Sequence, residues 1–240
     1  MNLETSLTIA AKELKVIRRK KSIIYSIIFL PLLLAASFSL VVKSQVASSS
    51  NYALGFDSLT YFFVVLSAIL PASIAAYSIV GEKVEKSLEP LLATPTTDGE
   101  ILVGKSIAAF IPPMLAMWTG ASIFMAASDY SSHDLLSFYY FPNWTAGVML
   151  LLLAPLAAIM SIELAVITSS RVTDIRGANQ IGSLMFIPFM GVFLTGVEGI
   201  FPFTASNLLI FSGIVLLVDV VLFFVSASTF KREEILTKWK

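Results

Sequence analysis

Six long, nearly uninterrupted apolar stretches constrain the fold of this chain more than any other feature. A helix needs about 20 mostly apolar residues to cross a bilayer, and the stretches that reach this length are 22–42, 59–80, 106–128, 144–168, 181–199 and 207–226. Transmembrane β-strands would instead alternate apolar and polar residues in segments of about ten. The pattern therefore predicts an all-α membrane protein with six transmembrane helices, in which residues 1–240 form a single membrane domain.

The composition excludes several classes of function. Charged residues make up 13% of the chain and hydrophobic residues 57%, whereas a soluble domain carries about 25% charged residues. The chain has no cysteine, and His133 is its single histidine, so neither thiolates nor a pair of histidines can bind a metal. Basic and acidic residues balance at 16 each, which gives no indication of a nucleic-acid partner. We therefore expect a membrane protein that holds no metal and no cofactor of its own.

The distribution of Lys and Arg predicts which side of the membrane each loop occupies. If the N-terminus is cytoplasmic, the segments 1–21, 81–105, 169–180 and 227–240 share that side and carry fifteen of the 16 basic residues. The other side keeps only Lys43. Because cytoplasmic loops are enriched in Lys and Arg, we expect a plasma-membrane protein with both termini in the cytoplasm.

The first and fifth stretches each allow a second interpretation. Basic residues precede the first, as in a secretory signal peptide, but the apolar core of a signal spans about 7–15 residues, whereas 22–42 is a longer run. We therefore expect the first helix to be retained. The fifth stretch contains Gly182, Pro188, Gly191 and Gly196, so we expect it to bend or to enter the bilayer and turn back.

Residues 3–20 have the pattern of an amphipathic helix. One face carries apolar side chains at helical spacing and the other carries basic ones; the apolar residues are Leu3, Leu7, Ala10, Leu14 and Ile17, and the basic residues are Lys12, Lys15 and Arg19. Such a helix lies in the membrane interface with its basic face toward anionic headgroups. The alternative is a basic anchor that only fixes the topology.

The longest polar segment between two spans covers residues 81–105. It begins as a charged helix, in which Glu82 and Lys86 are four residues apart in the favourable order, and Pro90 is expected to break or kink it. Turn-forming residues follow, and Asp98 is a candidate cap for the helix that leads into the third span. An apolar stripe either packs under its own bundle or docks on a soluble partner, and the composition leaves both open; its members are Val84, Leu88 and Leu91.

Two segments imitate the nucleotide-binding motifs of ATPases. Residues 99–106 fit the phosphate-loop pattern GxxxxGKS, and residues 214–219 imitate an apolar run that ends in a magnesium-binding Asp. The phosphate loop works only between a buried strand and a soluble helix, whereas here a polar turn precedes it and a membrane span follows. Glu100 would also place a negative charge among the phosphates, and Asp219 lies inside the sixth span. We therefore expect no ATP site and no enzymatic activity in this chain.

Glu163 and Asp219 are acids in the inner halves of the fourth and sixth spans. An ionised carboxylate at such a depth costs roughly 2.5–3.5 kcal/mol on insertion scales, and no Lys or Arg lies within the predicted spans to pair with either acid. One interpretation is a proton or cation site. The other, which we favour, is a hydrogen bond that helps two helices to pack and is worth about 0.6 kcal/mol on average.

The order of these features resembles the type-two ABC exporter permeases along essentially the whole chain. The most specific part runs from Glu82 to Lys105 and matches the pattern of that family at Glu89, Leu91, Leu92, Thr94, Pro95, Gly104 and Lys105. Further residues are similar to the subgroup of sodium- and drug-export permeases; they are Ser170, Arg171, Asp174 and Arg176 before the fifth span and residues 230–236 after the sixth.

The resemblance implies a role for each segment. Residues 1–21 would contain an elbow helix and 82–95 a coupling helix, both against separate cytoplasmic ATPase subunits that bind ATP and magnesium. The residues that would couple to the ATPase are Glu82, Glu85, Leu88, Glu89, Leu91, Leu92 and Pro95. A second permease, identical or different, would pair with this one to give twelve spans. Spans one, two and five would lie near the substrate route, and the pair would export a substrate by alternating access.

Two other functions also need to be weighed. A self-sufficient channel, or a proton- or cation-coupled carrier, could use Glu163 and Asp219. An intramembrane enzyme lacks the required residues, because the single histidine lies in an outer loop and cysteine is absent. A soluble ATPase encoded beside this chain would decide in favour of the exporter.

Overall fold

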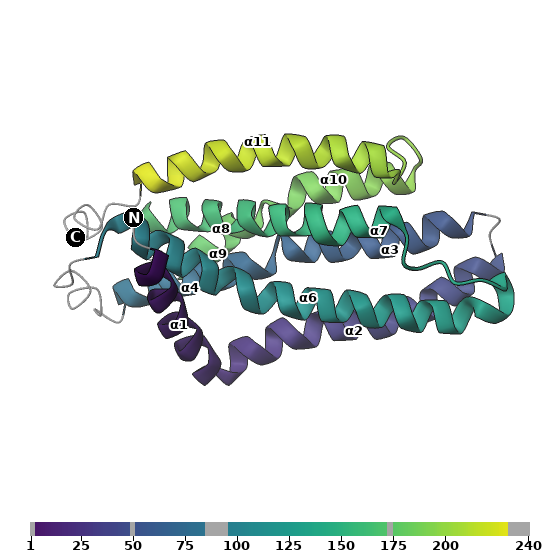
Figure 1. Ribbon diagram of the computed structural model, residues 1–240, viewed down its shortest axis with the longest axis horizontal. Coiled ribbons are helices and arrows are strands. Elements are labelled where there is room, and N and C mark those ends of the chain that lie inside the picture. The colour runs from purple at the N-terminus through teal and green to yellow at the C-terminus, as the bar shows by residue number, and fades with distance from the viewer. Residues whose placement is uncertain (1–2, 49–50, 85–95, 172–174, 230–240) are drawn as a thin grey trace.

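The computed structural model describes residues 3–48, 51–84, 96–171 and 175–229, and most of these are helical. The helices run along the long axis of the molecule, except for α1, which is inclined to the others at one end (Figure 1). We call this end, which also holds the start of α6 and the end of α11, the basal end. In chain order the helices are α1 (Leu3–Arg19), α2 (Lys21–Ser48), α3 (Tyr52–Ser67), α4 (Leu70–Val84), α6 (Asp98–Leu136), α7 (Trp144–Val148), the π-helix η1 (Met149–Leu153), α8 (Ala154–Arg171), α9 (Ile175–Ser183), α10 (Phe186–Val197) and α11 (Ala205–Thr229).

Six stretches of the described residues are long and apolar enough to cross a membrane, which confirms the six predicted spans. They are α2, then α3 with α4, then α6, then α7 through α8, then α9 with α10, and finally α11. The third span is longer than predicted, because α6 covers 39 residues, or roughly 58 Å at about 1.5 Å per residue. Polar residues continue α6 beyond the apolar stretch at both ends, and at its start the helix has a capping box formed by Thr97 and Glu100.

Three of the six spans are jointed, and each joint has a proline in the first turn of the helix that follows. Span two breaks between α3 and α4 ahead of Pro71, span four carries η1 ahead of Pro155, and span five breaks between α9 and α10 ahead of Pro188. Proline is tolerated at these positions because a first-turn N–H has no partner within its own helix. The bend predicted for the fifth span is therefore present.

The joint in span four receives a hydrogen bond from a neighbouring helix. In a π-helix each N–H bonds the carbonyl five residues earlier, and Pro155 has no N–H to offer the carbonyl of Leu150. The indole Nε1 of Trp118 in α6 donates to that carbonyl at 2.8 Å. Because an unpaired carbonyl is costly inside a membrane, this bond stabilises the joint and holds α6 against span four.

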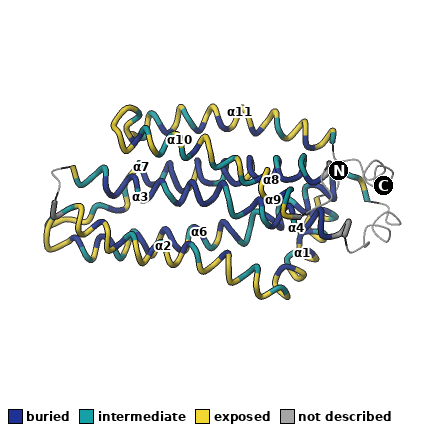
Figure 2. The backbone as a smooth tube through the Cα atoms, turned by 180° about the vertical axis from the view of Figure 1, so that it is seen from behind, coloured by how far each residue is buried: buried dark blue, intermediate teal, exposed yellow. Residues whose placement is uncertain are grey.

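The second span forms the centre of the bundle. Of its apolar stretch 83% is buried, against 22% for the first and sixth spans and 17% for the fifth. Figure 2 shows the buried α3 and α8 inside, with the more exposed α2 and α11 outside. On the outside α2 packs closely against α6 at Gly120. A Cβ added to this glycine would lie 2.8 Å from the Cβ of Pro31. The apolar side chains left on the outer helices face the hydrocarbon of the membrane in which the protein is embedded.

Candidate functional site

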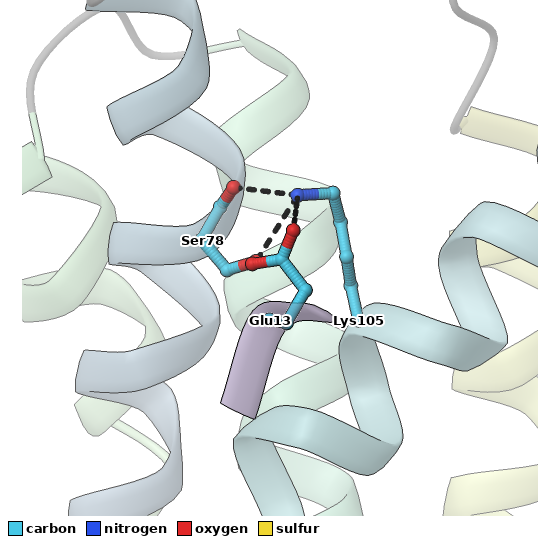
Figure 3. A network of polar contacts seen from close by, with 3 residues as sticks. All are labelled: Glu13, Ser78 and Lys105. Atoms are coloured by element: carbon cyan, nitrogen blue, oxygen red, sulfur yellow. Dashed lines mark hydrogen bonds and ion pairs between the residues drawn. The ribbon is translucent and has the colours of Figure 1, made fainter. Parts of the chain in front are cut away.

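A buried lysine joins three helices at the basal end. The ammonium of Lys105, near the start of α6, lies 3.4 Å from Oε1 of Glu13 in α1. It also donates to the carbonyl oxygen of Ser78 in α4 at 2.8 Å and to the Oγ of the same residue at 3.1 Å. The Ser78 hydroxyl donates in turn to Oε2 of Glu13 at 3.0 Å (Figure 3). We call these three residues the basal network.

The basal network is fully enclosed, since Glu13 is 6% exposed, Ser78 4% and Lys105 3%. A buried ion pair adds little net stability, but loss of one partner leaves the other charge buried and costs about 3–5 kcal/mol. The charges therefore favour one arrangement of α1, α4 and α6, in which each polar group finds its partner. Glu13 was not identified from the sequence. It lies three residues after Ala10 and four before Ile17, which is the spacing of one helix face.

The amphipathic character predicted for α1 is confirmed, but its apolar face is divided. Ala10 and Ile17 are buried against the bundle, whereas Leu3 and Leu7 are 65% and 57% exposed. The buried residues of α1 are Ser6, Ala10, Glu13 and Ile17. The helix is rotated toward the basal network because Glu13 has its partners there, and this leaves Leu3 and Leu7 on the outer surface.

The segment that imitates a phosphate loop forms the first turns of α6. Gly104 lets α1 lie directly on α6, because a Cβ there would lie 2.8 Å from both the Cβ of Ile9 and the backbone oxygen of Ser6. The next residue, Lys105, belongs to the basal network. The letters Gly-Lys thus have a structural explanation in helix packing and a buried ion pair.

The two helices that flank the segment predicted to couple to an ATPase meet the basal end, where α4 ends and α6 begins. The helix after it, α6, begins at Thr97, whose Oγ1 accepts from the N–H of Glu100 at 3.4 Å, while Oε2 of Glu100 accepts from the N–H of Thr97 at 3.0 Å. The prediction that Asp98 caps this helix is wrong by one position. Asp98 is the first helical residue, and the side chain of Thr97 before it accepts from a free backbone N–H of the first turn. Glu82 falls in the last turn of α4, and the other predicted coupling residues lie outside the described residues; these are Glu85, Leu88, Glu89, Leu91, Leu92 and Pro95.

Glu163 in α8 and Asp219 in α11 are buried on two helices that pack together, at 6% and 4% exposed. Among the described residues, Oε2 of Glu163 and both carboxylate oxygens of Asp219 have no hydrogen-bond partner. The packing hydrogen bond that we favoured is therefore not found. Glu163 instead borders a cavity of about 310 Å³ between α6, α8 and α11. Each acid can take up a proton or attract a cation, because a carboxylate without a partner is unfavourable in hydrocarbon.

At the opposite end of the bundle, two acids that were not identified from the sequence bind residues 137–143 by hydrogen bonds. Asp129 accepts from the backbone N–H groups of Tyr140 and Phe141, both at 3.0 Å. The side chains of Asp57 and Tyr140 are hydrogen-bonded, and burial, followed by the charge of Asp57, raises the pKa of Tyr140. The phenol therefore stays protonated and serves as the donor. For Asp57 and Asp129 alike, the only signal in the sequence was an acidic residue next to an apolar run.

Six membrane spans around a buried polar centre at one end place the chain in the class of helical membrane proteins. The family model described as "ABC-2 family transporter protein" matches residues 7–207, and the chain belongs to that family. Members of this family are membrane subunits rather than enzymes, and membership implies partnership with ABC ATPase subunits. The chain matches no curated protein. The resemblance to ABC permeases is thus confirmed at the level of the family.

Proposed function

We propose that this chain is the permease subunit of an ATP-driven exporter in the plasma membrane, with both termini in the cytoplasm. The observation that carries the proposal is the basal network, because it ties α1, the end of α4 and the start of α6 into one unit. The helices on either side of the predicted coupling segment, α4 and α6, both belong to this unit. A partner that binds this segment would therefore move three helices together.

In this proposal separate ATPase subunits hold ATP and magnesium and act on α1 and on the coupling segment. ATP binding can shift the permease between inward- and outward-facing states only if the ATPase binds the two states with different affinity. A second permease completes a twelve-span assembly, with spans one, two and five near the substrate route. The resemblance to sodium- and drug-export permeases supports export as the direction of transport.

The decisive experiment is the double change Leu91→Ala with Leu92→Ala. If these leucines are apolar anchors in a cleft of the ATPase, their truncation costs about 2 kcal/mol or more of binding. Recovery of the ATPase with the permease should fall and ATP-driven export should stop, while the melting temperature of the isolated permease stays unchanged. Glu82→Gln is the control, because charges at the rim of an interface affect mainly the association rate. Lower permease stability with unchanged ATPase binding would refute the coupling assignment.

The buried acids favour a second candidate, a channel or a proton- or cation-coupled carrier that works without an ATPase. Its support is that Oε2 of Glu163 and both carboxylate oxygens of Asp219 have no hydrogen-bond partner in the part of the chain that the structure describes. Ion or proton flux through the permease alone in liposomes, lost on Asp219→Asn, would favour this candidate. The absence of such flux, with ATP-driven transport in the complex, would decide for the exporter.

A further inference from the structure

A second cavity opens beneath α1, on the side of the bundle where α1 and α2 diverge. It measures about 500 Å³ and lies between α1, α2 and α6. This volume is within the range of about 300–1,000 Å³ found for ligand pockets. None of the roles proposed above uses it. We call it the elbow groove.

The walls of the elbow groove are apolar and open toward the bilayer. Ile28 and Leu32 of α2 and Leu115 of α6 line it and are 44%, 37% and 56% exposed. Thr119 also lines it, but its hydroxyl donates to the carbonyl of Leu115 at 2.7 Å. Such a groove offers water almost no hydrogen-bond partner, whereas an acyl chain can fill it without losing any hydrogen bond.

Arg18 supplies the positive charge of the elbow groove. It lines the groove from α1, it is exposed, and it makes no ion pair with a described residue. Two other cations at this end are engaged within the chain, since Lys20 lies 4.2 Å from the centre of the Tyr77 ring and Lys105 belongs to the basal network. The acid nearest to Arg18 along α1, Glu13, is bound in that network as well. The guanidinium is therefore available to a ligand outside the chain.

We propose that the elbow groove binds a phospholipid with an anionic headgroup, taken from the leaflet at the basal end. One acyl chain lies against Ile28, Leu32 and Leu115, and the phosphate region meets Arg18. A guanidinium suits this headgroup because its planar fork of donors matches phosphate oxygens, and basic segments at a membrane surface select anionic lipids. The bound lipid fills the space between α1 and α2, so it supports the angle at which α1 leaves the bundle.

The test compares lipids retained by the full-length chain, purified and placed in nanodiscs of phosphatidylcholine with increasing phosphatidylglycerol. Native mass spectrometry after release counts the bound lipids of each kind. Phosphatidylglycerol should be enriched over its share in the disc, and Arg18→Gln should reduce that enrichment about 5-fold, the factor that one basic residue contributes near an anionic surface. The matched control is Arg19→Gln, which removes the same charge from an exposed neighbour that does not line the groove.

A second variant tests the apolar part of the site. Leu115→Trp fills the groove and should remove the retained lipid whatever its headgroup, while Ile123→Trp, at another exposed position of α6, should not. Equal losses in Arg18→Gln and Arg19→Gln would overturn the proposal, because they indicate diffuse attraction to the basic helix. Equal retention of phosphatidylcholine and phosphatidylglycerol, or lipid that persists in a folded Leu115→Trp protein, would overturn it too.

Discussion

Lys105 and Glu13 form a buried ion pair at 3.4 Å although they are 92 residues apart in the sequence. One residue belongs to an amphipathic helix at the surface of the bundle and the other to the start of the third span. The pair therefore connects a helix outside the transmembrane bundle to the bundle itself. Ser78 completes the pair from the end of the second span.

The first prediction concerns this pair. Lys105→Met should lower the stability of the permease by about 3–5 kcal/mol, because Glu13 is left as an unpaired buried charge. Adding Glu13→Gln should recover most of the loss, since it removes that charge. Thermal unfolding of the parent and the two variants in detergent measures both effects. An unchanged melting temperature in Lys105→Met would mean that the ion pair does not form.

The second prediction concerns the contact between α1 and α6. Gly104→Ala should destabilise the protein by about 1–3 kcal/mol, since overpacking costs this much and the new methyl group would meet the backbone of Ser6. Gly99 is the matched control, because a Cβ there meets nothing within 4 Å. Gly99→Ala should be neutral or slightly stabilising. Equal effects of the two changes on the melting temperature would contradict the close approach of α1.

The third prediction concerns Glu163. Because its Oε2 has no hydrogen-bond partner within the described ranges, Glu163→Leu should raise stability, by about 1–3 kcal/mol if the full penalty of an unsatisfied buried group is relieved. Glu163→Gln, which keeps the shape and removes the charge, should be at least as stable as the parent. Transport assays on the same two variants show what the acid does. Loss of transport with a raised melting temperature would identify Glu163 as a residue retained for function.

The fourth prediction concerns topology. The chain has no cysteine, so single cysteines can be introduced at Ser87, Ser131 and Thr237. In intact cells a membrane-impermeant thiol reagent should label only the cysteine at position 131, because the distribution of Lys and Arg places the other two in the cytoplasm. All three should be labelled after the membrane is opened. Labelling of position 87 or 237 in intact cells would reject the proposed orientation.

The spans could be predicted because apolar length and helix-breaking residues are local properties of the sequence. The bend of the fifth span was visible in Pro188 for the same reason. The basal network could not be predicted, because the partners of Lys105 come from two other helices and the sequence does not say which faces meet. The same holds for α1, where Glu13 sets the rotation and leaves Leu3 exposed. The predicted cap of α6, Asp98, was wrong by one residue. Thr97 and Asp98 both have side chains that cap helices well, and only the backbone conformation decides between them.

α6 runs unbroken between the two ends of the bundle, whereas spans two, four and five are jointed. α6 carries Lys105 of the basal network near its start and Asp129 near its end, and Asp129 accepts from the backbone N–H groups of Tyr140 and Phe141. A joint absorbs a change of tilt where it arises, whereas a continuous helix passes the change along its length. The bond from Trp118 to the carbonyl of Leu150 holds α6 against span four near its middle, so a movement of the basal end of α6 would be transmitted past this contact toward the opposite loop. A movement imposed on one face of the membrane would then be transmitted to the other face along α6.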